Sequence, residues 1–205
     1  MSNRDTSIDS RLIESARKEF IEKGFIKAEL KTICENAKIT TGAVYKRYKG
    51  KEELFRAVVE KAVATLDSFV SERTDVDFSS MSDEEVRNTW IMNEKYILDV
   101  FRILWDIREE FVLLLEKSAG TVHENFGHDF AFRMTHAYTQ YYEEAKKRNI
   151  AKAEISDQEM HVLCTIFWTS VYEPFIHEMS WKEIEEHCKV VCRFMDWKNA
   201  VGIMD

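Results

Sequence analysis

The sequence has very few of the residues that form tight turns, with one proline and six glycines among 205 residues. Folds built from many short strands need such residues, so their scarcity argues against a turn-rich β fold. No stretch reaches the roughly 18 consecutive apolar residues of a membrane span, and residues 1–9 are too polar for a signal peptide. Four irregularly spaced cysteines form no disulfide pattern. We therefore expect a helical, cytoplasmic protein.

Charge is divided unevenly along the chain, whose formal net charge is −8. Residues 1–51 contain twelve basic and seven acidic residues, whereas the rest contains 17 basic and 30 acidic ones. Segment 36–51 carries five lysines and arginines and no acidic residue. A basic end on an acidic protein is typical of a chain that meets nucleic acid there. Charge alone leaves a second interpretation open, a solvated basic helix face.

Apolar residues recur at helical spacing along nearly the whole chain, which predicts an all-α fold of about nine helices. We expect a first helix over residues 9–23, with Gly24 as its C-terminal stop. A short second helix follows over residues 30–37, and Thr40 can cap a third. Gly50 separates the third helix from a long fourth one.

Three later helix starts share one signature, a serine followed three residues later by a glutamate. In such a pair the hydroxyl accepts the N–H of the third helical residue, and the carboxylate accepts the serine N–H. We therefore predict three capping boxes, at Ser82 and Glu85, Ser156 and Glu159, and Ser180 and Glu183.

Residues 30–51 have the pattern of a helix-turn-helix, whose second helix enters the major groove of DNA. Small residues open this helix, so its backbone can approach the base edges closely. Tyr45 can offer its hydroxyl to a phosphate and its ring to a thymine methyl group. Lys51 begins the next helix, where an anion is favoured, and the other basic side chains can neutralise phosphates. The predicted DNA-binding residues are Thr40, Thr41, Gly42, Ala43, Tyr45, Lys46, Arg47, Lys49 and Lys51.

The first quarter of the chain resembles the TetR family of bacterial transcriptional regulators. The similar runs are Glu22-Lys23-Gly24-Phe25, Thr32-Ile33-Cys34, residues 39–45 and residues 48–54. The resemblance implies that Tyr45 and Lys51 hold phosphates. It also implies that residues matching Thr41, Gly42, Ala43, Lys46 and Arg47 lie at or near the groove.

Several positions depart from the pattern that is usual in this family. Ala28 and Glu29 stand where Thr or Ser usually opens and caps the second helix. Lys38 replaces the usual glycine of the turn, so we expect modest strain if it adopts the left-handed conformation. Lys31 stands in place of the usual arginine and is expected to supply the phosphate contact made there.

Two helices near the C-terminus are apolar on more than one face. Residues 160–176 carry apolar side chains almost all round the helix. The last long helix also has more apolar residues than a single contact seam would need. We expect half of an intersubunit four-helix bundle; the alternative is one thick core without a partner. Pro174 should kink or end the first helix. The predicted interface residues are Phe167, Val171, Phe175, Ile184, Cys188, Val191 and Met195.

Aromatic residues are frequent in the middle of the chain, and the family resemblance implies that this region encloses an effector pocket. The same rings can equally belong to an ordinary core, and the sequence leaves this alternative open. The candidates for the pocket are Trp90, Phe101, Trp105, Phe126, Tyr138 and Trp168.

Signals for metal binding or catalysis are weak. Cys188 and Cys192 lie four residues apart, as two metal ligands on one helix face would, but they continue an apolar seam. The sequence has no phosphate-binding glycine loop, no nucleophile elbow and no recurring Glu-x-x-His pair. We therefore expect no metal, no cofactor and no enzymatic activity.

The sequence as a whole predicts a DNA-binding regulator. Residues 1–51 would form the helix-turn-helix domain, and residues 52–205 an effector-binding and dimerisation domain. We expect a homodimer on a near-palindromic operator, acting as a repressor that a small-molecule effector releases from the double-stranded DNA. The alternatives are a helical interaction protein with weakened DNA affinity and, less favoured, a helical small-molecule-binding enzyme.

Overall fold

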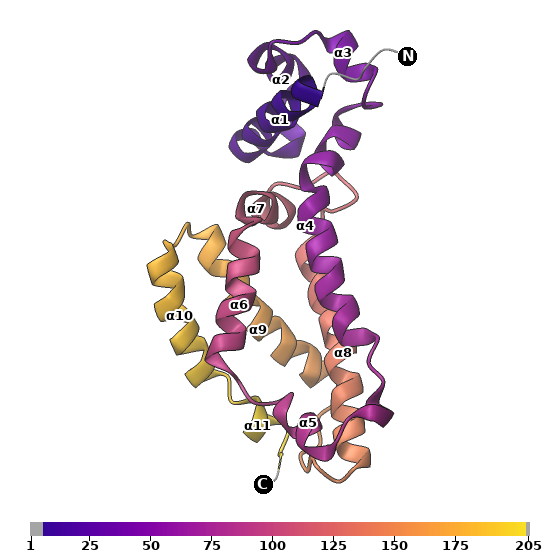
Figure 1. Cartoon of the computed structure of the whole chain (residues 1–205), viewed down its shortest axis with the longest axis vertical. Helices are drawn as coiled ribbons and strands as arrows, with labels where there is room; N and C mark the ends of the chain where they lie inside the picture. The colour runs from indigo at the N-terminus through magenta and orange to yellow at the C-terminus, as the bar shows by residue number, and fades with distance from the viewer. Residues whose placement is uncertain (1–5, 204–205) are drawn as a thin grey trace. The chain divides into compact units, whose positions relative to one another are not determined.

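The computed structural model describes residues 6–203, which fold into two compact helical units (Figure 1). The first unit comprises the chain up to Thr65 together with Ile107–Gly127, and the second comprises Leu66–Asp106 and the chain from His128 onward. Residues 6–203 form eleven α-helices, one 3-10 helix and a single isolated β-bridge. The predicted all-α class is confirmed. The helices outnumber the predicted nine because several are only one or two turns long.

The first unit is built around long α1, which Gly24 interrupts. At Gly24 the backbone has φ 71° and ψ 164°, so the helix breaks where its stop was predicted and then adds one short turn. Phe20 of α1 and Phe55 of α4 contact edge to face in the core, with ring centroids 5.1 Å apart. The helices of this unit are α1 (Thr6–Lys27), α2 (Leu30–Ala37), α3 (Thr41–Tyr45), the start of α4 (Lys51–Thr74) and α7 (Arg108–Glu116).

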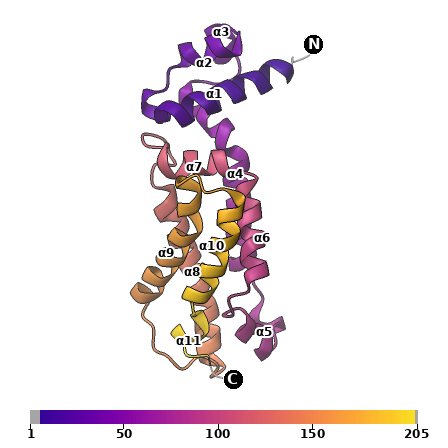
Figure 2. The same ribbon diagram turned by 90° about the vertical axis from the view of Figure 1, so that its left-hand side faces the viewer.

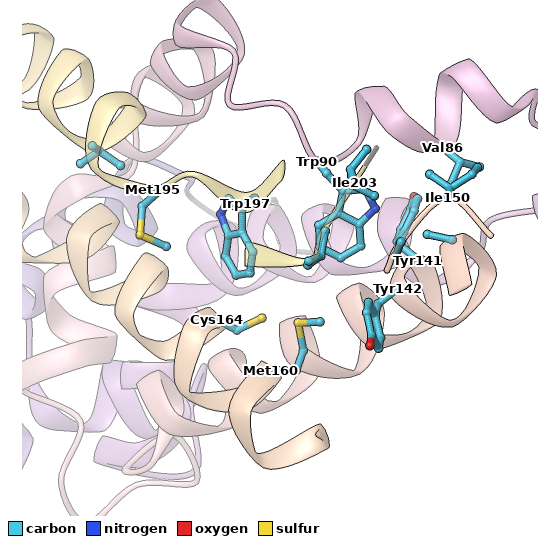
Figure 3. Close-up of a cluster of buried hydrophobic side chains, with 14 residues drawn as sticks. Val86, Trp90, Tyr141, Tyr142, Ile150, Met160, Cys164, Met195, Trp197 and Ile203 are labelled. Carbon is cyan, nitrogen blue, oxygen red and sulfur yellow. The ribbon is translucent and has the colours of Figure 1, made fainter. Parts of the chain in front are cut away.

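The second unit has a core of large apolar side chains from helices that lie far apart in the sequence. Figure 3 shows Trp90, Tyr141, Met160 and Trp197 in this cluster. No helix among the described residues is long and apolar enough to cross a membrane. Besides the end of α4, the unit contains η1 (Phe78–Ser80), α5 (Asp83–Asn88), α6 (Glu94–Trp105), most of α8 (Phe126–Lys147), α9 (Asp157–Ile176), α10 (Trp181–Phe194) and α11 (Trp197–Ala200).

All three predicted capping boxes are present, at the starts of α5, α9 and α10. In the second of them the Ser156 hydroxyl accepts the Glu159 N–H at 3.2 Å, and the Glu159 carboxylate accepts the Ser156 N–H at 2.9 Å. The hydrogen bonds from Ser156 hold the pKa of Glu159 below its ordinary value. The same local pattern therefore starts three helices of the second unit.

A single arginine holds the connection between α4 and α5. The Arg148 guanidinium, at the end of α8, donates to the carbonyls of Phe78 at 2.6 Å and Met81 at 2.7 Å. It also pairs with Asp83 at 3.2 Å and with Glu144 at 2.6 Å. These bonds fix a segment that has little regular structure of its own.

Pro174 lies inside α9, and the helix continues for two residues beyond it. Proline has no N–H, so the carbonyl of Ser170 lacks its usual partner four residues on. His187 of α10 takes that place, with Nε2 donating to the Ser170 carbonyl at 2.7 Å. The carbonyl released by proline therefore joins α9 to α10, which lie side by side (Figure 2).

The capping box of α9 can be tested by Ser156→Ala, which removes the hydroxyl that accepts the Glu159 N–H. We expect the free energy of unfolding to fall by about 1 kcal/mol, measured by urea unfolding. Ser68→Ala is the control, because Ser68 is exposed within α4 and alanine suits a helix interior. Equal losses in the two variants would contradict a special role for the cap.

Candidate nucleic-acid interface

A short connection that begins at Lys38 joins α2 to α3, which Figure 1 labels. Lys38 adopts the left-handed conformation, with φ 55° and ψ 48°, and its N–H bonds the last carbonyls of α2. Thr40 then caps α3, because its hydroxyl accepts the Ala43 N–H at 3.2 Å. The sequence predicted the cap, and it gave the left-handed conformation of Lys38 as the condition for strain at the turn.

Buried side chains fix α2 and α3 against the rest of the first unit. Ile33 of α2 and Val44 of α3 are fully buried. Ser15 of α1 donates its hydroxyl to the Ile33 carbonyl at 2.8 Å, a buried bond between two helices. The inner sides of both short helices are therefore committed to packing, and only their outer sides are available to a partner.

The N-terminus of α2 is capped from another helix. Glu29 makes no capping bond with its own side chain, as expected from the replacement of the usual Thr or Ser. Instead, the buried carboxylate of Glu19 on α1 accepts the Glu29 N–H at 3.2 Å. A carboxylate at this position also interacts favourably with the dipole of α2. Glu19 was not among the residues predicted from the sequence, because no local pattern connects residues ten positions apart.

The outer side of α3 and the segment after it carry exposed side chains. Tyr45 is 59% exposed, which is high for a large aromatic residue. Lys46 and Lys49 are also exposed, and no described carboxylate forms an ion pair with either ammonium group. Thr41 and Gly42 are exposed at the start of the helix, and Ala43 is half-buried. The structure thus brings most of the predicted DNA-binding residues to one accessible segment.

Arg47 and Lys31 already have acidic neighbours. Arg47 is paired with Asp9 of α1 and donates to the Ala43 carbonyl at 3.2 Å. Its side chain is only 14% exposed, so Arg47 contributes to the packing of α3 on α1. Lys31 lies on the exposed side of α2, with Nζ 3.9 Å from the Glu35 carboxylate.

Lys51 closes the C-terminal end of α1. Its ammonium group donates to the carbonyls of Ile26 and Ala28, each at 3.0 Å, and lies 4.6 Å from the centroid of the Phe25 ring. Partial burial lowers the pKa of Lys51. A cation at a helix C-terminus is favourable, so Lys51 has a structural role in addition to the predicted phosphate contact.

The second unit contains a cavity of about 520 Å³ between the C-terminal part of α4, the loop before α6, α8 and the C-terminal segment. Of the six residues predicted for an effector pocket, Trp90 and Tyr138 line this cavity. Arg73, Tyr96 and Trp197 line it too, although they were not among the predicted pocket residues. Their sequence positions carry no signal that they meet, because the cavity forms only when α4, α6 and the C-terminal segment assemble.

The other four predicted pocket residues lie elsewhere. Phe101 and Trp105 are close to Phe175, with ring centroids 6.2 and 6.5 Å apart. Trp168 packs on Phe130 at 4.2 Å, and Phe126 belongs to the first unit. None of the four lines the cavity that contains Trp90.

The residues predicted for a dimer interface mostly face the interior of their own chain. Phe167 lines the cavity, and the other six are buried: Val171, Phe175, Ile184, Cys188, Val191 and Met195. The exposed apolar side chains of these helices are instead Val162 and Ile166 on α9 and Val190 and Phe194 on α10, with Phe132 on α8. The excess of apolar residues was noted correctly, but the sequence did not show which face turns inward.

Cys188, the first of the two free cysteines of α10, belongs to the packing of the second unit. Cys188 is fully buried, and its thiol donates to the Glu94 carbonyl with a sulfur–oxygen distance of 3.6 Å. Burial raises the pKa of Cys188 to about 12, so the thiol stays protonated. Among the described residues no group of three or more His, Cys, Asp or Glu side chains is arranged to hold a metal ion.

The turn at Lys38, the capped α3 and the exposed segment after it define a helix-turn-helix protein. Residues 12–58 match the family described as "Bacterial regulatory proteins, tetR family". The match covers the helix-turn-helix part of the chain, which is therefore similar to the DNA-binding part of that family. The description of the matching family names regulatory proteins, the class of function that the sequence predicted.

Individual relatives match parts of the chain. The chain is 29% identical to the Transposon Tn10 TetC protein of Escherichia coli over 98 residues, which is 48% of each chain. It is 36% identical to the HTH-type transcriptional regulator UidR of Escherichia coli (strain K12) over 59 residues, or 27% of this chain and 30% of UidR. The chain thus spans about half or less of the length of these curated relatives.

A solved structure with the same fold covers nearly the whole chain. NalD of Pseudomonas aeruginosa, described as the secondary repressor of the MexAB-OprM multidrug efflux pump, superposes with a TM-score of 0.60. The match covers 93% of this chain and 97% of NalD at 15% sequence identity. At that identity the likeness establishes the fold alone.

The cap that α1 supplies to α2 predicts a measurable effect of Glu19→Ala. The variant leaves the Glu29 N–H without its buried acceptor, so we expect the free energy of unfolding to fall by about 1–2 kcal/mol in urea unfolding. Glu22→Ala is the matched control, because Glu22 is an exposed glutamate of the same helix. A loss for Glu19→Ala no larger than for Glu22→Ala would refute the capping role.

Proposed function

We propose that the chain is a DNA-binding transcriptional regulator that acts as a homodimer and releases its operator when a small molecule binds the second unit. Repression is the commoner mode in the family that residues 12–58 match. The helix-turn-helix domain proposed over residues 1–51 would contact DNA. The remaining residues, 52–205, would bind the effector and the second copy.

The observation that carries this proposal is the outer side of α3. Tyr45, Lys46 and Lys49 are exposed together beside a helix start made of small residues. This arrangement suits insertion of α3 into a major groove, with Thr40, Thr41, Gly42 and Ala43 nearest the bases. The lysines would neutralise phosphates on either side. Lys31, Arg47 and Lys51 remain proposed phosphate contacts, although Arg47 and Lys51 are already held within the unit.

The exposed apolar residues of α9 and α10 support a homodimer. Val162 and Ile166 are four residues apart on α9, and so are Val190 and Phe194 on α10, so each pair lies on one helix face. Phe194 is 72% exposed. A second copy that covers these faces would complete a four-helix bundle and remove the apolar surface from water. Two heads in one dimer would read two half-sites about 34 Å or more apart.

The test of regulation is selection of bound DNA from a random duplex pool. A two-fold symmetric dimer reads two copies of one half-site in opposite orientation, so we expect an enriched inverted repeat. Sequencing of the retained DNA measures this. Enrichment of no sequence would contradict the proposal and favour an interaction protein with weakened DNA affinity.

The selected DNA then tests the assigned residues through salt dependence. In Lys46→Ala/Lys49→Ala the protein loses two phosphate contacts, so the slope of log K against log salt should fall by about two. Lys61→Ala is the control, because Lys61 is an exposed lysine of α4 outside the basic segment. An unchanged slope in the double variant would remove these lysines from the interface.

The dimer proposal predicts the mass of the protein in solution. We expect about twice the 24.2 kDa chain mass, measured by sedimentation equilibrium. Phe194→Glu places a charge in the proposed interface and should weaken dimerisation at least about 100-fold. Ile103→Glu on α6 is the control, because Ile103 is an exposed apolar residue outside the proposed faces. A monomeric wild-type protein at micromolar concentration would refute the bundle.

A further inference from the structure

The cavity of the second unit is lined by a buried N–H group without a described acceptor, that of Trp90, and by an arginine without a described ion pair, Arg73. We infer that it binds an aromatic carboxylate, whose ring lies among the aromatic side chains and whose oxygens meet Trp90 and Arg73. This inference rests on the proposed function, in which the second unit binds an effector. It adds the chemical class of that effector.

Trp90 indicates that the ligand carries a hydrogen-bond acceptor. Its side chain lines the cavity and is only 2% exposed, yet its indole N–H has no hydrogen-bond partner among the described residues. A buried N–H group is nearly always satisfied in a folded protein, because leaving it unpaired is unfavourable. An acceptor on a ligand would meet this need, and the cavity is where such a ligand can sit.

Arg73 indicates that the ligand carries a negative charge. Its guanidinium lies 3.5 Å from the centroid of the Phe69 ring and 5.7 Å from that of Tyr96, and it donates to the Phe69 carbonyl at 2.7 Å. No described carboxylate forms an ion pair with it, so its positive charge is not neutralised within the chain. Glu72 is the acidic residue of the lining, but it is exposed and accepts from Ser68 at 3.3 Å. A partly buried, unpaired arginine favours an anionic ligand group with two oxygens.

Tyr138 lines the same cavity as these two side chains. Its ring centroid is 6.2 Å from that of Trp90. Burial raises the pKa of Tyr138, so the phenol keeps its proton. The hydroxyl therefore adds a third donor to the cavity that Arg73 and Trp90 line, and all three groups suit an acceptor-rich ligand.

The walls favour a flat ring as the ligand body. Trp197 lies parallel to Tyr138 at 6.0 Å, and its centroid is 6.2 Å from those of Trp90 and Phe167. Figure 3 shows Trp90 and Trp197 within the buried cluster of the unit. Aromatic walls bind planar apolar surface through stacking and edge contacts. The volume of about 520 Å³ lies within the range of small-molecule sites.

Calorimetric titration of the full chain with three matched naphthalenes tests the inference. The probes are 3-hydroxy-2-naphthoate, the neutral 3-hydroxy-2-naphthamide, and 2-naphthol, which lacks the carboxyl group. We expect the carboxylate to bind at least about ten-fold more tightly than the amide, because its charge strengthens the hydrogen bonds to Arg73. Equal affinities for acid and amide, or no binding of either at about 1 mM, would overturn the inference.

Variants assign the preference to particular residues. Arg73→Met should reduce the ten-fold preference to about two-fold or less, whereas Arg73→Lys should retain most of it. Lys95→Met is the control, because Lys95 is an exposed cation of α6 that does not line the cavity. A preference that survives in Arg73→Met would exclude Arg73 as the anion contact and overturn the inference.

The two cavity tryptophans form a second matched pair. Trp90→Phe and Trp197→Phe remove similar ring area, but only Trp90 has the buried unpaired N–H. We expect Trp90→Phe to weaken carboxylate binding about five-fold more than Trp197→Phe does. Equal effects would contradict a hydrogen bond between the Trp90 N–H and the ligand. Titration of the selected DNA with the same samples separates the two proposals, because lost DNA binding with an intact ligand preference would contradict only the regulator function.

Discussion

The fold depends on acceptors for the first N–H groups of its helices. A helix leaves several N–H groups without partners at its start, and a chain of many short helices meets this problem repeatedly. Ser82, Ser156 and Ser180 solve it with capping boxes, and Thr40 does so at α3. These residues fix where the helices begin, and therefore which side chains face each core.

At the start of α2 the acceptor for the N–H group comes from another helix and not from a neighbouring residue. Glu19 supplies the acceptor from α1, and Lys51 returns from α4 to the carbonyls at the end of α1. One acidic and one basic side chain thus fix both ends of the link between α1 and α2. Neither bond involves α3, whose exposed side chains at Tyr45 and Lys46 are not used to hold this link.

The features that could be predicted from the sequence are those that depend on neighbours within four positions. The capping boxes, the left-handed Lys38 and the interruption at Gly24 are of this kind. A helix with apolar residues on two faces is different, because periodicity does not show which face packs inside the chain. Ile184 and Val191 therefore turned out to be core, whereas Val190 and Phe194 are exposed.

The cavity could not be predicted for a related reason, since its walls come from segments more than a hundred residues apart. Arg73 and Trp197 have no sequence relation that would place them together. Pro174 shows the same limit. It leaves the Ser170 carbonyl without its usual helical partner, and nothing in the local sequence indicates that His187 of α10 donates to this carbonyl instead. Long-range partners of this kind appear only once the helices have assembled.

The continuity of α4 gives the proposed regulation a physical basis. The helix begins at Lys51, whose ammonium group holds the end of α1, and it carries Arg73 in its last turn, beside the cavity. A ligand that pairs with Arg73 therefore acts on the same helix that anchors the helix-turn-helix. A ligand shifts a conformational equilibrium only by its difference in affinity for the two states. Regulation by such a ligand thus requires that the affinity of the cavity for it differs between the DNA-bound and the released state.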